Sequence, residues 1–316
     1  MTIIKSSLLG FAIGDALGLP IQFIPREKLN KRIIDMQGYG TFNMPKGTWS
    51  DDTSLTLATL DSICDKKCID YEDIMQKFVL WLKNGEYTPN GKSFDIGQTC
   101  LTSISNYIYK EKEPLCCGGI SINSNGNGSL MRMLPLALYC YYLNISNNEI
   151  LELTCRLSSL THQHEISKLG CYVYVQFVIE LIKSKNKYKA YKYIQNLDYS
   201  CFSENSLFAY HRILENNIYE FDINEIKSSS YVVDTLEASL WCLINNNNYE
   251  DSVITAINLG DDTDTIGAIT GSLAGILYGF DDIPKRFIDD LQKKDDLINY
   301  AQIFEEIIYF LSARLL

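Results

Sequence analysis

The chain has 316 residues, of which 46% are hydrophobic and 21% charged, and its formal net charge is −11. Apolar residues are too many, and proline and glycine too few, for a disordered chain. An acidic surface repels phosphate backbones, so we expect no nucleic-acid partner. Ten scattered cysteines without a CxxC pair indicate reduced thiols and a cytoplasmic protein. Because no apolar run of about 20 residues is uninterrupted, we expect no membrane span, and we expect a monomer.

Apolar residues recur at steps of three and four along most of the chain, which is typical of amphipathic helices. We find no series of alternating strands, so the pattern predicts an all-α fold in one compact domain, residues 1–316. Long ordered loops are expected at 18–49, 84–97 and 111–128, and the stretches 183–196 and 245–248 read as connectors or solvated helix ends. The expected helices cover, in chain order, 6–17, 51–64, 74–82, 98–109, 129–143, 147–159, 165–184, 236–243, 249–258, 265–278, 284–292 and 303–315.

Two acidic motifs each open an expected helix. In the first, WSDDT at 49–53, Ser50 is a natural N-cap that leaves Asp51 and Asp52 in the first turn. These acids alone are explained by favourable interaction with the helix dipole. The second motif, GDDTDT at 260–265, holds three carboxylates and two hydroxyls, more than a helix cap requires, although a solvated acidic turn is the alternative.

Taken together, the two motifs are more informative than either alone. They lie more than two hundred residues apart in sequence, and carboxylate and hydroxyl oxygens are the ligands that Mg²⁺, Mn²⁺ or Ca²⁺ prefer. If the motifs face each other, they can hold two hard cations about 3.5–4 Å apart, an arrangement used for hydrolysis. The spacing excludes an EF-hand.

Two glycine-containing segments complete the pattern. No strand precedes the segment at 10–18, so a dinucleotide-binding fingerprint is disfavoured; its small residues favour close helix packing and leave Asp15 as an orienting group. The segment at 124–129 precedes an expected helix, and its backbone N–H groups can form a diphosphate cradle, with an ordinary surface loop as the alternative.

These motifs, in this order, resemble those of the ADP-ribosylglycohydrolases. The resemblance runs from residue 10 to about 280 and rests on GDALG at 14–18, WSDDT at 49–53, GNGSLMR at 126–132, TH at 161–162 and DTDTIG at 262–267. It implies an all-α fold with a binuclear Mg²⁺ or Mn²⁺ site. It also implies hydrolysis of the glycosidic bond between ADP-ribose and a modified protein side chain.

Carried over residue by residue, the resemblance implies a set of ligands and contacts. The metal ligands it implies are Ser50, Asp51, Asp52, Asp262, Asp264 and Thr265. The substrate contacts it implies are Gln22, Ser124, Gly126, Asn127, Gly128, His162 and Tyr231. Asp95, or one of the metal-binding Asp51 and Asp262, would then assist proton transfer while a metal-activated water attacks the anomeric carbon.

The sequence departs from the family pattern at three positions. Gln22 stands where many relatives carry Glu, and since Gln cannot take a proton, this disfavours serine-linked and polymeric substrates and favours arginine-linked mono-ADP-ribose. Asp261 and Ser230 each stand where Gly is frequent. The alternatives are hydrolysis of a small ADP-ribose conjugate and an inactive ADP-ribose-binding protein. We expect a packing or capping role for His164 and a structural ion pair for Arg132.

Overall fold

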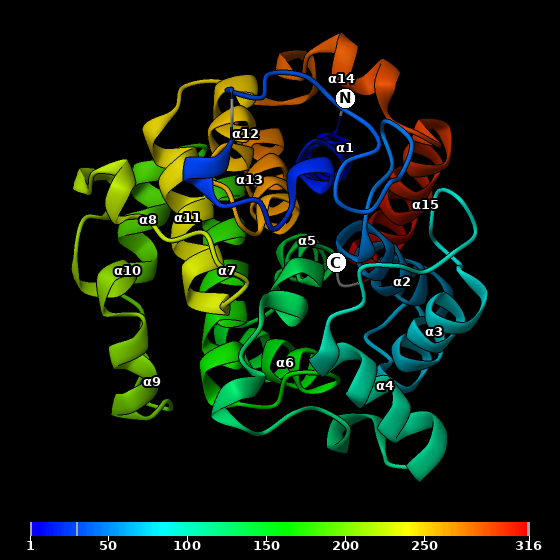
Figure 1. Cartoon of the computed structure of the whole chain (residues 1–316). Coiled ribbons are helices and arrows are strands. Elements are labelled where there is room, and N and C mark those ends of the chain that lie inside the picture. Colours follow the sequence, from blue (N-terminus) through cyan, green and yellow to red (C-terminus); the bar gives the residue numbers. More distant parts are fainter. Residues whose placement is uncertain (1, 30, 315–316) are drawn as a thin grey trace.

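The structure is a computed structural model that describes residues 2–29 and 31–314 (Figure 1). Within these residues the chain forms fifteen α-helices and short 3₁₀ turns but no β-strand, only two isolated bridges. The all-α prediction is confirmed. The helices are α1 (Ile3–Gly18), α2 (Asp51–Lys66), α3 (Tyr71–Asn84), α4 (Gln98–Lys110), α5 (Leu134–Tyr142), α6 (Asn147–Ser159), α7 (Glu165–Ser184), α8 (Lys187–Gln195), α9 (Glu204–Ala209), α10 (His211–Glu215), α11 (Val232–Asn245), α12 (Tyr249–Ile257), α13 (Thr263–Tyr278), α14 (Lys285–Asp290) and α15 (Lys294–Ser312).

Two segments differ from the predictions. The expected helix at 129–143 is a 3₁₀ turn, η5 (Asn127–Arg132), followed by α5, because Pro135 cannot donate a backbone hydrogen bond and is tolerated only in the first turn of a helix. The stretch 183–196, expected as a connector or a solvated helix end, contains α8, which buries Ala190, Tyr191 and Ile194 on one face. The lysines and asparagines of this stretch made its apolar face difficult to recognise in the sequence. The short helices α9 and α10 were not predicted, and residues 315–316 lie outside the described residues.

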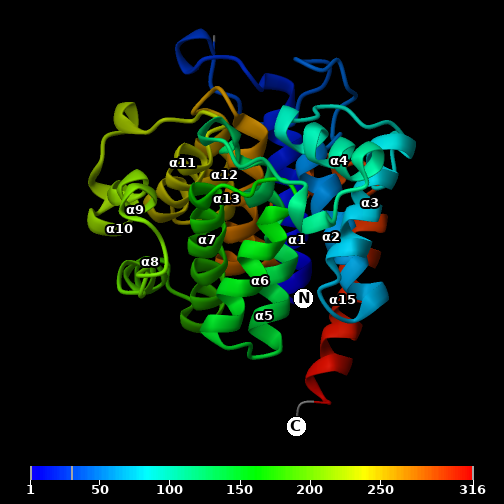
Figure 2. The same ribbon diagram turned by 90° about the horizontal axis from the view of Figure 1, so that it is seen from below.

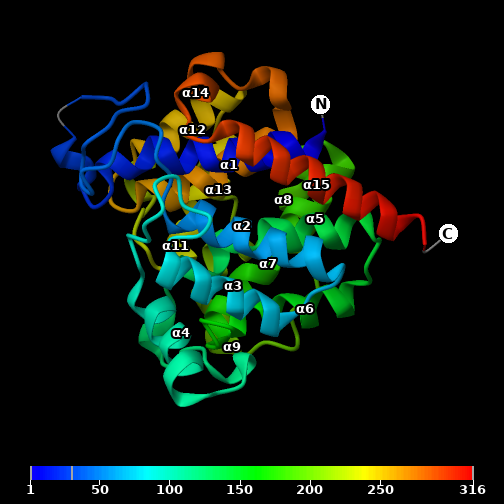
Figure 3. The ribbon, with the colours of Figure 1, turned by 90° about the vertical axis from the view of Figure 1, so that its right-hand side faces the viewer.

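Helices α1 and α13 form the most extensive helix pair in the fold and lie side by side in Figures 1 and 3. They run antiparallel, and glycines on a four-residue spacing let their backbones touch. A Cβ added at Gly10, Gly14 or Gly18 would lie 2.4, 1.9 or 2.2 Å from a backbone oxygen of α13. Only glycine fits at such distances, so the small residues fix both the separation and the register of the two helices.

One segment among the described residues, Ile3–Ile21, is long and apolar enough to cross a membrane by length and composition. It comprises α1 and the turn that follows it. Its apolar window is 83% buried inside the protein, where α1 packs against α13 and α15. This burial accounts for the apolar composition.

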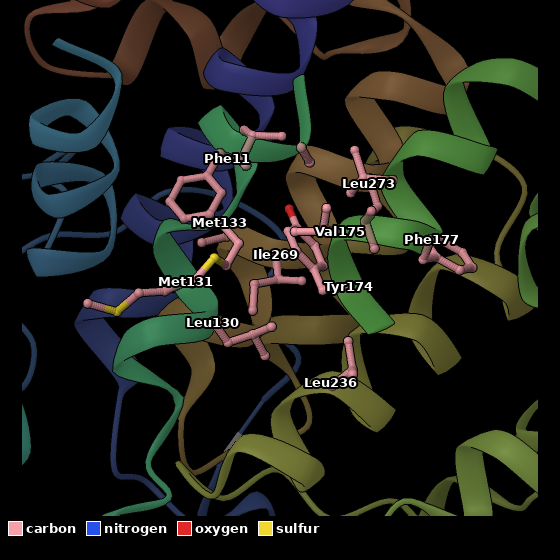
Figure 4. Close-up of a cluster of buried hydrophobic side chains, with 14 of the residues drawn as sticks. Phe11, Leu130, Met131, Met133, Tyr174, Val175, Phe177, Leu236, Ile269 and Leu273 are labelled. Carbon is pink, nitrogen blue, oxygen red and sulfur yellow. The ribbon is translucent and has the colours of Figure 1, made fainter. Parts of the chain in front are cut away.

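The core lies between α1, α7, α11 and α13 (Figure 4). Phe11 from α1 and Ile269 and Leu273 from α13 meet Tyr174 and Val175 from α7, all buried. Burying one such side chain contributes about 1.5–3 kcal/mol to stability. The same core supports η5, which contains the end of the glycine-containing loop and leads into α5. The loop between α1 and α2 lies beyond one end of this bundle, where the two acidic motifs are also found (Figure 2).

Candidate active site

The first acidic motif caps α2 as expected. The Ser50 hydroxyl accepts a hydrogen bond from the Asp52 backbone N–H at 3.2 Å and donates to the Asp52 carboxylate at 3.0 Å. Asp51 and Asp52 both lie in the first helical turn and are buried. The predicted N-cap is therefore confirmed, and the carboxylates face inward rather than toward solvent.

Asp15 of α1 holds this turn in place. Its carboxylate accepts hydrogen bonds from the Ser50 N–H at 2.9 Å and from the Thr53 N–H and hydroxyl at 3.1 and 2.6 Å. Burial raises the pKa of Asp15 to about 6 in spite of these donors. The predicted orienting role of Asp15 is confirmed by these contacts.

The second acidic motif opens α13 directly opposite. Thr265 joins the two motifs, since its hydroxyl lies 3.2 Å from a carboxylate oxygen of Asp52 and 3.2 Å from one of Asp262. Asp264 is fully buried in the first turn of α13. The expectation that the two motifs face each other is therefore confirmed. The Asp261 carboxylate, in contrast, lies near Ser228 and does not line the cavity between the motifs.

Packing these carboxylates together is electrostatically costly. Burial, and then the charge of Asp95, raises the pKa values of Asp51 and Asp264 well above the ordinary range, and burial followed by the charge of Asp15 does the same for the pKa of Asp52. Within the described part of the chain, one oxygen each of Asp52 and Asp264 is buried without a hydrogen-bond partner. Buried, unpartnered carboxylate oxygens require compensation, and a hard divalent cation supplies it.

The residues expected to bind metal therefore fit such an ion chemically. Oxygen atoms alone make up the donor set, and the charge to be neutralised is already concentrated there. In residues 2–29 and 31–314, no three His, Cys, Asp or Glu side chains converge in the geometry of a metal site.

A cavity of about 220 Å³ lies between the motifs. Asp95 lines it from the loop before α4, with φ = +53°, a left-handed conformation that is unusual outside glycine. Burial raises the pKa of Asp95 to about 6. The cavity is also lined by residues to which the sequence analysis gave no role: Phe23, Gln98, Thr99, Cys100 and Met131. Tertiary packing brings them together.

Gln22 is buried beside the carboxylates and also lines the cavity. Its side chain lowers the pKa values of Asp95 and Asp262 and so opposes part of the burial effect. Among the described residues its own side-chain oxygen has no partner. Gln22 is thus a neutral polar neighbour of the acidic cluster at a position where a Glu would add another negative charge.

The glycine-containing loop forms another wall of the cavity. Asn127 ties it to the second motif, because its amide donates to Asp262 at 2.6 Å and to the Thr235 hydroxyl at 3.0 Å. Gly126, Asn127 and Gly128 line the cavity. Ser124 instead lines a neighbouring cavity of about 570 Å³, which shares Gln98 and Thr99 with the first.

Tyr231 lies at the edge of this region, 36% exposed, and lines neither cavity. Its backbone forms an isolated antiparallel bridge to Gly126, while Ser230 accepts a hydrogen bond from the Asn127 N–H at 3.0 Å. The segment at 230–231 therefore supports the loop through its backbone.

The two neighbouring histidines have different roles. His162 is buried and lines the cavity, and burial raises the cost of charging it, so its pKa is lowered to about 3. The ring of His164 accepts a hydrogen bond from the Ile166 N–H at 3.3 Å and caps α7, as expected.

Arg132 does not form the ion pair that the sequence led us to expect. Within the described residues no carboxylate lies within ion-pair distance of its guanidinium, which donates instead to the carbonyls of Gly128 and Leu157 and to the Thr161 hydroxyl. It also lies over the Phe78 ring, 4.9 Å from the centroid. In this buried position neutral acceptors and an aromatic face replace the acidic partner.

The all-α fold, the two facing acidic motifs and the glycine-containing loop together are typical of one protein family. The sequence profile of the ADP-ribosylglycohydrolase family matches residues 3–309, and the chain belongs to that family. The prediction of an enzyme of this family is confirmed.

Individual members of this family are similar to the chain over most of its length. The chain is 33% identical over 302 residues to an ADP-ribosylarginine hydrolase, Tri1, of Serratia proteamaculans, covering 94% of this chain and 77% of the relative. It is 31% identical over 293 residues to the ADP-ribosyl-[dinitrogen reductase] glycohydrolase of Rhodospirillum rubrum, covering 91% and 90%. A solved ADP-ribosylglycohydrolase-related protein complex has a TM-score of 0.81 at 25% identity and covers 97% of this chain and 98% of its own.

Proposed function

We propose that this chain is a metal-dependent hydrolase that removes mono-ADP-ribose from arginine side chains of modified proteins. The observation that carries the proposal is the pair of facing acidic motifs, bridged by Thr265, with unpartnered oxygens of Asp52 and Asp264 beside a glycine-containing loop. Two relatives named ADP-ribosylarginine hydrolase, 33% and 31% identical, support the arginine linkage.

We propose that two Mg²⁺ or Mn²⁺ ions are held between the motifs. Such ions lower the pKa of a coordinated water and offset the repulsion among the carboxylates. Asp15 contributes by fixing the first turn of α2, and Thr265 by keeping the two motifs at a constant separation. The proposed ligands are Ser50, Asp51, Asp52, Asp262, Asp264 and Thr265.

Asp95 is the proposed proton-transfer residue. It lines the cavity, and because burial raises its pKa to about 6, it can both accept and release a proton near neutral pH. A carboxylate at this place also pairs favourably with a guanidinium leaving group. Gln22 lowers the pKa of Asp95 and, being neutral, does not compete for the proton.

The proposal is tested with peptides that carry ADP-ribose on arginine or on serine, incubated with Mg²⁺, Mn²⁺ or EDTA, with release of ADP-ribose followed by mass spectrometry. We expect metal-dependent release from arginine alone. Release from serine would contradict our interpretation of Gln22. Binding of ADP-ribose without release from either peptide would favour a small ADP-ribose conjugate as substrate or an inactive binding protein.

A pair of matched variants separates a role in the cavity from a general effect of charge. Asp95→Asn removes the proposed proton carrier, so we expect activity to fall by about 10²–10⁴-fold. Asp261→Asn makes the same chemical change in a neighbouring acid that does not line the cavity, and we expect near-normal activity. Equal loss in both variants would contradict the role assigned to Asp95.

We also propose a monomer that works in the cytoplasm. All ten cysteines are free, and six of them are buried: Cys64, Cys100, Cys117, Cys140, Cys171 and Cys242. Reduced thiols in these positions fit a reducing compartment. Light scattering measures the mass of the particle, and a mass near 36.0 kDa is expected.

A further inference from the structure

His162 lies between a buried hydroxyl on one side and the glycine-containing loop on the other. Its Nδ1 is 2.7 Å from the Thr161 hydroxyl oxygen. Its Nε2 has no hydrogen-bond partner among the described residues and faces the loop, since a Cβ added at Gly126 would lie 3.6 Å from Nε2. Because Gly126 and Gly128 both lack side chains, this nitrogen stays open toward the cavity that His162 lines.

The direction of each hydrogen bond follows from the donors and acceptors present. Arg132 can only donate, so the Thr161 hydroxyl oxygen accepts from Nη2 at 2.7 Å. The Thr161 proton then has one acceptor among the contacts that the structure shows, which is His162 Nδ1. A neutral imidazole whose Nδ1 accepts a hydrogen bond carries its proton on Nε2.

We propose that Arg132 and Thr161 are positioning residues that hold His162 as the Nε2–H tautomer, a fixed donor toward a diphosphate bound at the glycine-containing loop. This proposal rests on the proposed function for the identity of the ligand. A diphosphate offers only acceptor oxygens, so an Nε2 lone pair in this place would repel it. The other tautomer therefore presents the wrong group to the ligand.

Two further observations support the proposal. The ring stays neutral near pH 7, because burial, and then the charge of Arg132, lowers the pKa of His162 to about 3. The tautomer, rather than the charge, thus decides whether Nε2 can donate. The same guanidinium donates to the Gly128 carbonyl at 2.6 Å, so Arg132 holds the loop and the histidine at once.

The tautomer is measured directly on the full-length protein by two-bond ¹H–¹⁵N correlation spectra. Assignment uses His162→Gln, because the chain has only three histidines. We expect His162 to show a single Nε2–H state. An Nδ1–H state, an imidazolium or a mixture of tautomers would overturn the proposal. The measurement needs neither ligand nor turnover, so its result does not depend on the proposed function.

The role of Thr161 is tested with two variants that differ in the hydroxyl group. Thr161→Val removes the proton donor to Nδ1, and we expect loss of the single Nε2–H state and about tenfold weaker ADP-ribose binding by calorimetry with Mg²⁺. Thr161→Ser retains the hydroxyl and should restore both. Unchanged spectra and affinity in Thr161→Val would overturn the assignment.

A matched control is available in α6. The Thr154 hydroxyl is buried but has no hydrogen-bond partner in residues 2–29 and 31–314, so Thr154→Val makes the same change without breaking a contact seen there. We expect wild-type spectra and affinity. If Thr161→Val does not fold, the wild-type and Thr161→Ser spectra still decide the tautomer. A wild-type protein with the Nε2–H state but no affinity for ADP-ribose would overturn the proposed ligand and leave the tautomer assignment in place.

Discussion

Replacing Gly14 with alanine adds one methyl group at the closest approach of α1 and α13. That Cβ would lie 1.9 Å from the Gly267 carbonyl oxygen and 2.8 Å from the Ala268 backbone nitrogen. Both neighbours are backbone atoms, which cannot rotate away as a side chain can. Since real Cβ contacts closer than 3.0 Å are essentially never seen, the helices must move apart locally by about 1 Å.

The magnitude follows from two opposing effects. Overpacking of a tight core costs about 1–3 kcal/mol or more, and a clash with backbone belongs at the upper end. Alanine recovers about 1 kcal/mol through its higher helix propensity. We expect a net loss of about 2 kcal/mol in the free energy of unfolding. Asp15 lies on α1 and Asp264 on α13, so a displacement of the helices by about 1 Å also moves these carboxylates. We expect activity to fall by about 100-fold as a result.

Urea denaturation followed by circular dichroism measures the stability, and release of ADP-ribose measures the activity. Gly97→Ala is the control for stability, because its Cβ would meet nothing within 4 Å and its φ of −58° suits alanine. We expect that control to change the free energy of unfolding by less than about 1 kcal/mol. Wild-type stability in Gly14→Ala would refute the reasoning about helix contact.

Three other predictions concern the acidic cluster. Asp264→Asn should abolish the rise in melting temperature that Mg²⁺ gives the wild type while the helical spectrum survives, and full activity in this variant would contradict the metal proposal. Asp261→Gly should raise the free energy of unfolding by up to about 1 kcal/mol in urea titrations, because Asp261 has φ = +57° and glycine adopts this conformation without strain. In EDTA, stability should fall as pH rises from about 4 to about 6. The pKa values of Asp15 and Asp95 are raised to about 6, so the native state retains protons that the unfolded chain releases in this window. Urea midpoints against pH check this slope, which Asp95→Asn should reduce.

The parts of this structure that the sequence predicts are those set by local signals. Ser50 before two acids predicts a capped helix, and the small residues around Asp15 leave it as an orienting group; both expectations agree with the hydrogen bonds. The local pattern did not predict α8, because its lysines and asparagines make the segment look polar. It also misplaced the start of α5, because Pro135 fixes that boundary.

The remaining features depend on packing between distant segments. Nothing in the sequence near Gly14 says that its partner is Gly267, although the small residues at 10–18 predict close helix packing. The role of Thr265 as a bridge to Asp52 likewise requires the register of α1 against α13 and the position of α2. We predicted an ion pair for Arg132 because the sequence shows its charge. The sequence does not show the neutral acceptors that surround it in the fold.

The pairing of α1 with α13 also determines when the site can form during synthesis. Gly18 contacts Thr263, so about 245 residues separate the end of α1, which carries Asp15, from the start of α13, which carries the second acidic motif. At about 5–20 residues per second, a ribosome needs roughly 12 to 50 s to make that stretch. During this interval the largely apolar helix α1 lacks α13, its most extensive packing partner. An incomplete chain therefore carries the first acidic motif beside a helix whose main packing face is still uncovered, and the two motifs can face each other only after α13 is made.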